Sequence, residues 1–387
     1  MSAIKVVIVT ALIAALFSAC GAPGGGGGGN LLPGETITGA TGSVKVALLL
    51  PISAPGSASS VAKALKQAAE LALFDFDNPD ISLVPKDTMG TPNGARAAAQ
   101  SAVKDGAELI IGPLFAQEVS AAAQVARSAG IPMIAFSSDE KVAGNGVYLL
   151  SFLAGRDVPR IVSFAMSRGK RNFAVLVPQT AYGRIAEAAF AKAVASGGGS
   201  APVRASFSGS NMDAAVQQVA SAVQSGQQID ALFLPAGQEE LPRLAPQLAA
   251  AGLTSAKVQF IGTGQWDYPN VGSQQALVGG WYPAPDPKAW NSFAARYAKT
   301  FGGTPPRIAS LGYDAMSLAV SLSQNPPGER YSFSQLTRAS GFAGVDGLVR
   351  LLPDGTSERG LAILEVRPGS PQVISPAPRS FSTASTY

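Results

Sequence analysis

The side chains that could do chemistry in this chain are few in kind. Its 387 residues contain no histidine and one cysteine, Cys20. Ser-His-Asp and Cys-His catalysis, zinc sites built on histidine or cysteine, and disulfides within the chain are therefore excluded. Carboxylate-only chemistry remains, in principle, available. The close acidic pairs are Asp75 with Asp77, Asp139 with Glu140, and Glu239 with Glu240. None of these pairs indicates an acid-base dyad, so we predict no enzyme, no catalytic residue, no metal and no cofactor.

Cys20 ends an apolar run, Val6–Ala19, that follows a short N-terminus carrying Lys5. A basic start, an apolar stretch of roughly 7 to 15 residues and small residues before the cut are typical of a secretory signal. The segment LFSACG resembles a bacterial lipobox, from which it departs at Phe17. The alternative is an incidental thiol in a transmembrane helix, but about 14 apolar residues are too few to span a bilayer comfortably. We therefore predict lipidation of Cys20.

A glycine-rich segment follows the cysteine and includes six consecutive glycines, Gly24–Gly29. Such a segment is a flexible tether. We assign residues 1–19 to a lipoprotein signal peptide and residues 20–42 to the lipidated cysteine and its tether. Gly21 stands where aspartate is associated with inner-membrane retention. We therefore expect a lipid-anchored protein of the outer membrane that faces the periplasm.

Composition predicts a folded, secreted body after this tether. The chain is 47% hydrophobic and 14% charged, and its length suffices for two lobes with sizeable cores. The net charge of +4 is small and scattered along the chain, so it gives no support for nucleic-acid binding.

From Ser43 onward, short apolar runs alternate with amphipathic ones, which predicts repeated βαβ units and largely parallel sheets. In the first half we expect strands at 44–50, 81–85, 108–111 and 132–136, and helices at 59–76, 93–104 and 116–128. A second set has strands at 172–177, 203–207, 229–234 and 257–262, and helices at 156–168, 184–195, 212–224 and 239–251. Later elements are helices at 288–301 and 308–324 and strands at 348–352 and 361–366. We expect the tail, 368–387, to be disordered.

Three of the predicted strands end in proline, at Pro51, Pro178 and Pro235, and each is followed by a polar or glycine-containing loop. Loops at the carboxyl ends of parallel strands are where such sheets bind ligands. Two similar lobes in tandem make the cleft between them the default site.

Several segments carry a family resemblance over residues 43–366. They are VKVALLLPISAPGS, ELALFDFD, the stretch from KDTMGTPNGAR to IPMIAFSSD, and NFAVLVPQTAYGR. They resemble type I periplasmic binding proteins of the leucine/isoleucine/valine-binding group. The resemblance implies an α/β fold of two Rossmann-like lobes with parallel sheets and a hinge. We place lobe 1 at 43–155 plus 282–340 and lobe 2 at 156–281 plus 341–367. The phrases LLLP, LALFD, GPLF and IAFSSD most resemble proteobacterial penicillin-binding protein activator lipoproteins.

The resemblance also implies cleft residues in lobe 1. The loop that offers a hydroxyl or backbone donor to a ligand carboxylate contains Ala116 and Gln117, with alanine where serine is usual. The next loop offers Ser137, Ser138 and Asp139. The two serines could instead satisfy backbone groups at a strand end, and Asp139 would repel a carboxylate unless it turns away or meets an ammonium group.

Lobe 2 contributes the other implied cleft residues. Tyr182 matches the family tyrosine that packs over the ligand, although it could instead pack at the hinge. The family acid that pairs with the ligand ammonium falls at Gly264 or Gln265, where no carboxylate stands, and Asp267 is close enough to substitute. Trp266 lies in the same loop, where it could line a pocket or a partner surface, or pack in the core.

Two functions remain open. The loss of two standard ligand anchors, at Ala116 and near Gly264, favours a lipoprotein that binds and activates a class A penicillin-binding protein, that is, a peptidoglycan synthase. The alternative is a receptor that closes on a branched-chain or other amino acid and delivers it to an ABC permease.

Overall fold

The structure is a computed structural model that describes residues 43–77, 79–153 and 155–381. The predicted signal peptide, the lipidation site at Cys20 and the glycine tether lie outside the described residues. In the described segments, no helix is long and apolar enough to cross a membrane.

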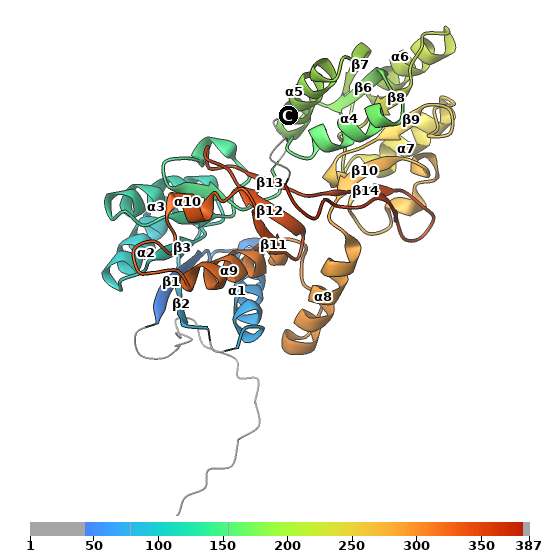
Figure 1. Ribbon diagram of the computed structural model, residues 1–387. Coiled ribbons are helices and arrows are strands. Elements are labelled where there is room, and N and C mark those ends of the chain that lie inside the picture. The colour runs from blue at the N-terminus through green and yellow to red at the C-terminus, as the bar shows by residue number, and fades with distance from the viewer. Residues whose placement is uncertain (1–42, 78, 154, 382–387) are drawn as a thin grey trace, which may run out of the picture. The chain divides into compact units, whose positions relative to one another are not determined.

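Lobe 1 is built on a five-stranded parallel sheet of order β2-β1-β3-β4-β5. Its strands are β1 (Val44–Leu50), β2 (Ile81–Asp87), β3 (Leu109–Ile111), β4 (Met133–Ala135) and β5 (Val147–Leu149). Its main helices are α1 (Ser57–Phe74), α2 (Pro92–Lys104), α3 (Ala116–Ser128), α8 (Pro287–Phe301) and α9 (Ala309–Ser323). Figure 1 shows orange α9 beside blue α1, although they come from opposite ends of the chain.

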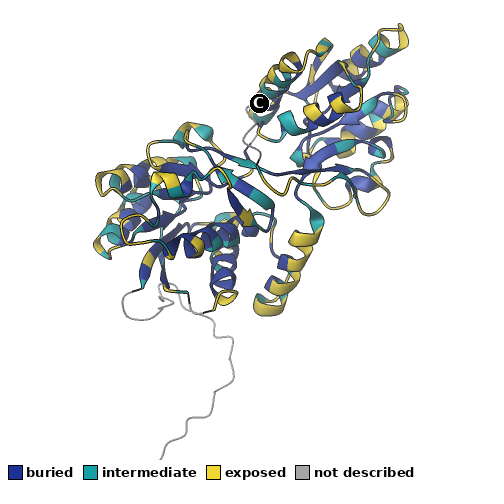
Figure 2. Ribbon diagram, in the orientation of Figure 1, coloured by how far each residue is buried: buried dark blue, intermediate teal, exposed yellow. Residues whose placement is uncertain are grey.

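The central strand β1 explains why lobe 1 has two covered faces. Its alternate residues Val46 and Leu48 pack in one apolar cluster with Leu65 of α1, whereas Ala47 and Leu49 pack in another with α2 and α3. A strand buried on both faces reads as a continuous apolar run, which is the pattern VKVALLL. Figure 2 shows the strands of lobe 1 largely buried and the exposed residues mainly on helices and loops.

Lobe 2 is built on a seven-stranded sheet of order β15-β14-β10-β9-β8-β6-β7. Its strands are β6 (Asn172–Pro178), β7 (Ser200–Phe207), β8 (Ala231–Phe233), β9 (Gln259–Ile261), β10 (Trp281–Ala284), β14 (Ala362–Glu365) and β15 (Gln372–Ser375). Strands β6 to β10 run parallel, and β14 and β15 add antiparallel pairs at one edge. Helices α4 (Val158–Ser167) and α5 (Ala181–Ser196) pack on one face, and α6 (Met212–Gln224) and α7 (Leu241–Ala250) on the other.

The later part of the chain is divided between the lobes differently from the prediction. Strands β11 (Phe342–Gly344), β12 (Gly347–Leu351) and β13 (Ser357–Arg359) form a small antiparallel sheet. Its Val349 and Leu351 pack in the lobe 1 core, so placing 341–359 in lobe 2 was wrong. Strand β10 pairs with β9 and β14, so 282–284 belong to lobe 2 rather than lobe 1. The sequence predicts short apolar strands, but their partners are chosen only in the folded chain.

The predicted disordered tail also contains structure. Residues Gln372–Ser375 form β15, which pairs with β14, so the prediction of disorder was wrong for this segment. Its Val and Ile side chains suit a half-buried edge strand within an otherwise Pro- and Ser-rich stretch. Further on, Phe381 lies over the guanidinium of Arg350, 4.6 Å from its Cζ.

The chain passes between the two sheets in three segments. The first connection joins β5 to α4, the second joins β10 to α8, and the third joins β13 to β14. These three segments bring residues from distant parts of the sequence to one place, where the cavity described next is found.

Candidate ligand-binding site

A cavity of about 290 Å³ lies at these connections. The connections contribute residues from 151–157, 283–285 and 357–361, and lobe 2 contributes most of the remaining lining. Cavities that hold small molecules in proteins start at roughly 300 Å³ and are lined mostly by apolar groups with a few placed polar ones. A site of this size suits one small solute.

Three of the predicted cleft residues line this cavity, namely Tyr182, Gln265 and Asp267. Trp266 does not, because its side chain is fully buried in the lobe 2 core and its indole Nε1 donates to the carbonyl of Leu234 at 3.1 Å. For Trp266, the core-packing interpretation is therefore correct. Neighbouring residues of one loop are thus split between the core and the cavity.

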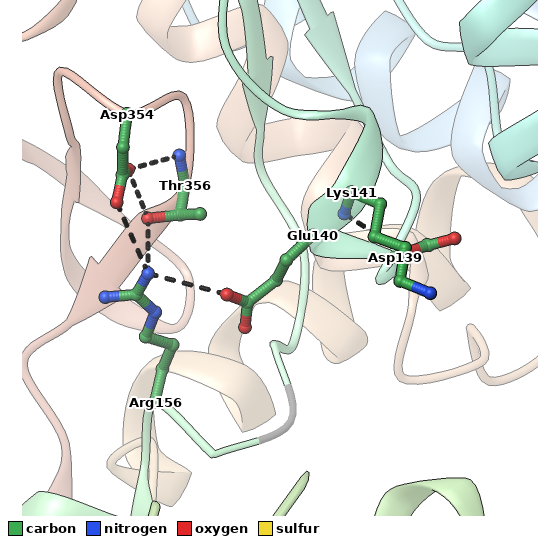
Figure 3. A network of polar contacts seen from close by, with 6 residues as sticks. All are labelled: Asp139, Glu140, Lys141, Arg156, Asp354 and Thr356. Atoms are coloured by element: carbon green, nitrogen blue, oxygen red, sulfur yellow. Dashed lines mark hydrogen bonds and ion pairs between the residues drawn. The ribbon is translucent and has the colours of Figure 1, made fainter.

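The lobe 1 candidates Ala116, Gln117, Ser137, Ser138 and Asp139 do not line the cavity. Ala116 and Gln117 begin helix α3. The hydroxyl of Ser137 accepts a hydrogen bond from the backbone nitrogen of Asp139 at 3.1 Å. The Asp139 carboxylate in turn accepts from the backbone nitrogen of Lys141 at 3.1 Å (Figure 3). Ser137 and Asp139 thus hydrogen-bond backbone groups of the turn, and for Ser137 this agrees with the alternative interpretation.

Tyr182 is placed by the start of helix α5, whose N-cap Thr180 accepts a hydrogen bond from Gly183. The Tyr182 hydroxyl donates to the hydroxyl of Thr263 at 2.7 Å. Burial, together with the nearby charge of Asp157, raises the pKa of Tyr182 above its ordinary value. The phenol therefore stays a neutral hydrogen-bonding group at the cavity wall.

Asp157 is the acidic residue that the sequence analysis missed. It lines the cavity at the end of the first connection, where its Oδ2 accepts a hydrogen bond from the backbone nitrogen of Gly264 at 2.5 Å. Its other oxygen, Oδ1, is buried and has no hydrogen-bond partner. Burial raises the pKa of Asp157, and the backbone hydrogen bond from Gly264 lowers it. In space, the Asp157 carboxylate thus lies beside Gly264, where the sequence itself has no acid.

Nothing in the local sequence distinguishes Asp157 from a helix cap. It precedes Val158 and Pro159, and an aspartate before a proline-containing first turn is a common helix start. Its partner Gly264 is 107 residues away. Asp267, the predicted substitute, lines the cavity too, but it lies 3.7 Å from the guanidinium of Arg307. Partial burial raises the pKa of Asp267, and Arg307 lowers it.

Two arginines of the lining have partners of their own. Figure 3 shows Arg156 donating to the Thr356 hydroxyl at 2.8 Å, with the carboxylates of Glu140 and Asp354 each 3.5 Å away. Arg156 thereby joins the first connection to the turn between β12 and β13. Such part-exposed ion pairs contribute little stability, on the order of 0 to 1 kcal/mol.

Arg307 is held by several groups. It forms an ion pair with Asp346, which is fully buried and also accepts a hydrogen bond from the Ser310 hydroxyl at 2.6 Å. The Arg307 guanidinium lies over Trp290, 4.4 Å from the ring centroid. A buried carboxylate needs such compensation, because desolvation of an unpaired charge is costly.

The third arginine, Arg359, has a different environment. Its side chain is 6% exposed, and its Nε and both terminal nitrogens have no hydrogen-bond partner. Two further lining residues, Tyr268 and Ser357, have buried hydroxyls without partners. Most buried polar groups in proteins are hydrogen-bonded, so such atoms require an explanation where they gather at one cavity.

Comparison with known proteins identifies the class. A family model described as periplasmic binding protein matches residues 43–371, so the chain belongs to the periplasmic binding protein family. A comparison with curated protein sequences gave no match. The fold is shared with solved structures of this class.

Three of those structures show the extent of the similarity. A protein provisionally assigned as a branched-chain amino acid ABC transporter from Rhodospirillum rubrum is 20% identical with a TM-score of 0.76, over 86% of this chain and 100% of that one. A leucine-binding protein from Thermotoga maritima is 20% identical with a TM-score of 0.58, over 86% and 98%. An ABC transporter solute-binding protein from Rhodopseudomonas palustris, in complex with 3,4-dihydroxybenzoic acid, is 22% identical with a TM-score of 0.59, over 88% and 98%.

These findings confirm the predicted type I periplasmic binding protein fold and the resemblance to the leucine-binding group. The family is one of binding proteins, in agreement with the prediction of a non-enzyme. The resemblance to penicillin-binding protein activators gains no support from them. The alternative, a solute-binding protein of an ABC transporter, agrees with them better.

Proposed function

We propose that this protein is the solute-binding receptor of an ABC transporter, which takes up an amino acid or another small polar solute and delivers it to a membrane permease. The observation that carries the proposal is the position of the Asp157 carboxylate at Gly264, on the wall of the cavity. An acid at this place can accept a hydrogen bond from a ligand ammonium or hydroxyl group through its unpartnered Oδ1.

This position removes one of the two reasons for preferring an activator. The activator hypothesis depended on a missing acid near Gly264 and a missing hydroxyl at Ala116, and Asp157 provides the acid. The family match supports the receptor, and the named relatives include a leucine-binding protein and a protein in complex with a dihydroxybenzoic acid. We also propose that the receptor is exported and held by a lipid on Cys20, facing the periplasm, where a solute can reach it, with the glycine segment as a flexible tether.

The proposal is tested by titrating the purified protein with L-amino acids and small aromatic acids in a calorimeter. We expect micromolar or tighter binding of at least one solute. The variant Asp157→Asn should weaken that binding by about tenfold or more, because a hydrogen bond to a charged group is worth roughly 1.5 to 3 kcal/mol. Asp213→Asn is the matched control, since Asp213 is exposed on α6 and does not line the cavity.

Two results would count against the receptor. One is the absence of binding to every solute offered, including uncharged sugars and amides. The other is co-purification of the protein with a class A peptidoglycan synthase rather than with permease components. That result would favour the activator function over the receptor.

A further inference from the structure

The cavity wall carries cationic side chains that could bind an anionic ligand group. Three arginines, Arg156, Arg307 and Arg359, stand against two carboxylates, Asp157 and Asp267. Burial raises the pKa of both acids. Whether a small carboxylate can bind here therefore depends on which guanidinium keeps free hydrogen-bond donors.

Among these arginines, Arg359 has hydrogen-bonding capacity to spare. The guanidinium of Arg156 donates to Thr356 and lies beside two carboxylates, and that of Arg307 is paired with Asp346 and Asp267. The nitrogens of Arg359, by contrast, are buried without a hydrogen-bond partner. A guanidinium presents five N–H donors in a planar fork, which matches the two oxygens of a carboxylate.

The neighbours of Arg359 explain why its donors are unused. Arg359 forms an ion pair with Asp314, whose Oδ2 is 3.6 Å from the Arg359 terminal nitrogen, too far for a hydrogen bond. The other oxygen of Asp314 accepts a hydrogen bond from the backbone nitrogen of Val345 at 2.6 Å. The hydrogen bond from Val345 thus holds the Asp314 carboxylate beside the Arg359 guanidinium, but Asp314 accepts no hydrogen bond from Arg359. The ring of Phe152 lies 5.1 Å from the Arg359 Cζ. Phe152 is 40% exposed and also lines the cavity, so an apolar surface adjoins the cation.

We propose that Arg359, at the end of β13, is the anchor for the carboxylate of a small solute. This inference rests on the proposed receptor function and names the ligand class of the same cavity. The anchor lies on the third connection, rather than in the lobe 1 loop where Ala116 has lost the usual hydroxyl. Ser357, two residues earlier on the same strand, adds an unpartnered hydroxyl that can donate to the second carboxylate oxygen.

The test compares carboxylates with their amides on the unaltered protein. L-Leucine and 3,4-dihydroxybenzoate are titrated beside leucinamide and 3,4-dihydroxybenzamide, together with uncharged sugars. The amide keeps the shape of each solute and removes the anion. We expect at least one of the acids to bind at least about tenfold more tightly than its amide. The amide cannot form the charge-assisted bidentate pair that a carboxylate forms with the Arg359 guanidinium.

Variants then assign the effect to one side chain. Arg359→Gln should lose tenfold or more of the affinity for the acid and none of the affinity for the amide. Arg359→Lys should recover part of it, because lysine retains the charge but not the planar fork. Arg350→Gln is the matched control, since Arg350 lies on neighbouring β12 and does not line the cavity. If Arg359→Gln fails to fold, the comparison of acid and amide still decides the ligand class, and Arg359→Lys decides the residue.

The outcomes separate this inference from the proposed function. If an acid and its amide bind equally well, or if Arg359→Gln binds the acid as tightly as the unaltered chain, the carboxylate anchor is wrong and the receptor stands. If only uncharged solutes bind, the anchor is again wrong and the receptor stands. If nothing in the panel binds, both are overturned.

Discussion

The Asp157 carboxylate lies 2.5 Å from the backbone nitrogen of Gly264, across 107 residues of sequence. This contact joins the first connection between the sheets to the loop after β9 and places an acid on the cavity wall. A Cβ at position 264 would lie 3.1 Å from Asp157 Oδ2 and 3.6 Å from the carbonyl of Pro283. The glycine therefore leaves room for the carboxylate.

Replacing this glycine should disturb the site without removing any of its functional groups. In Gly264→Val, the added side chain should push Asp157 from its place and weaken solute binding about tenfold, which corresponds to roughly 1.4 kcal/mol. Calorimetry on the best solute measures the change. Gly209→Val is the control, because Gly209 is exposed with no heavy atom within 4 Å of a built Cβ. Equal affinity in both variants would contradict this account of the contact.

The affinity for a carboxylate solute should increase as the pH falls from about 8 to about 6. Burial and the charge of Asp346 raise the pKa of Asp314 to about 7, and Arg359 opposes the shift. Below that pH the Asp314 carboxyl is protonated, so it no longer competes with the solute for Arg359. The solute carboxylate, with a pKa near 4, stays ionised over this range.

Titrations between pH 5.5 and 8.5 measure this dependence, and Asp314→Asn should bind well at all of these pH values. The other charged groups near Asp314 are Asp346 and, through its ion pair with Asp346, Arg307. Because the chain contains no histidine, a transition near pH 7 points to a shifted carboxyl group. An affinity that is flat over this range would contradict the role of Asp314.

The close approach of α1 and α9 makes a third prediction. A Cβ on Gly312 of α9 would lie 2.4 Å from the carbonyl oxygen of Leu65 in α1. Alanine favours helices over glycine by about 1 kcal/mol, but overpacking costs about 1 to 3 kcal/mol. Gly312→Ala should therefore lower the free energy of unfolding of the protein, as measured by urea denaturation. Gly209→Ala should leave it nearly unchanged, and a stabilised Gly312→Ala would show that the helices separate freely.

The lipid anchor is tested in cells. We expect Cys20→Ser to abolish membrane attachment and to yield a soluble or uncleaved form, because the lipid is attached through the thiol of that cysteine. Fractionation and mass spectrometry of the N-terminus measure this. Normal lipidation in the variant would show that the anchor is not at Cys20.

Much of the fold could be read from local pattern. Helices α3 and α6 have the predicted bounds, 116–128 and 212–224, and β1 covers the predicted run at 44–50. Each of these elements has a clear hydrophobic pattern. The helices have apolar residues on one face, and the strand is a continuous apolar run in a sheet that is covered on both faces. Their order along the chain also predicts the parallel sheets, because βαβ units connect strands in one direction.

The sequence by itself determined the alternation of strands and helices, the two-lobed fold class and the absence of histidine chemistry, since all of these are local or compositional. Only the tertiary structure decided which sheet takes β10 to β13 and which side chains meet at the cavity. Strands of three to five residues, such as β10 and β13, are too short for their hydrophobic pattern to specify a partner strand. Asp157 and Arg359 carry no local signal of function, because their proposed roles depend on neighbours, Gly264 and Asp314, that the chain brings to them only when it is folded.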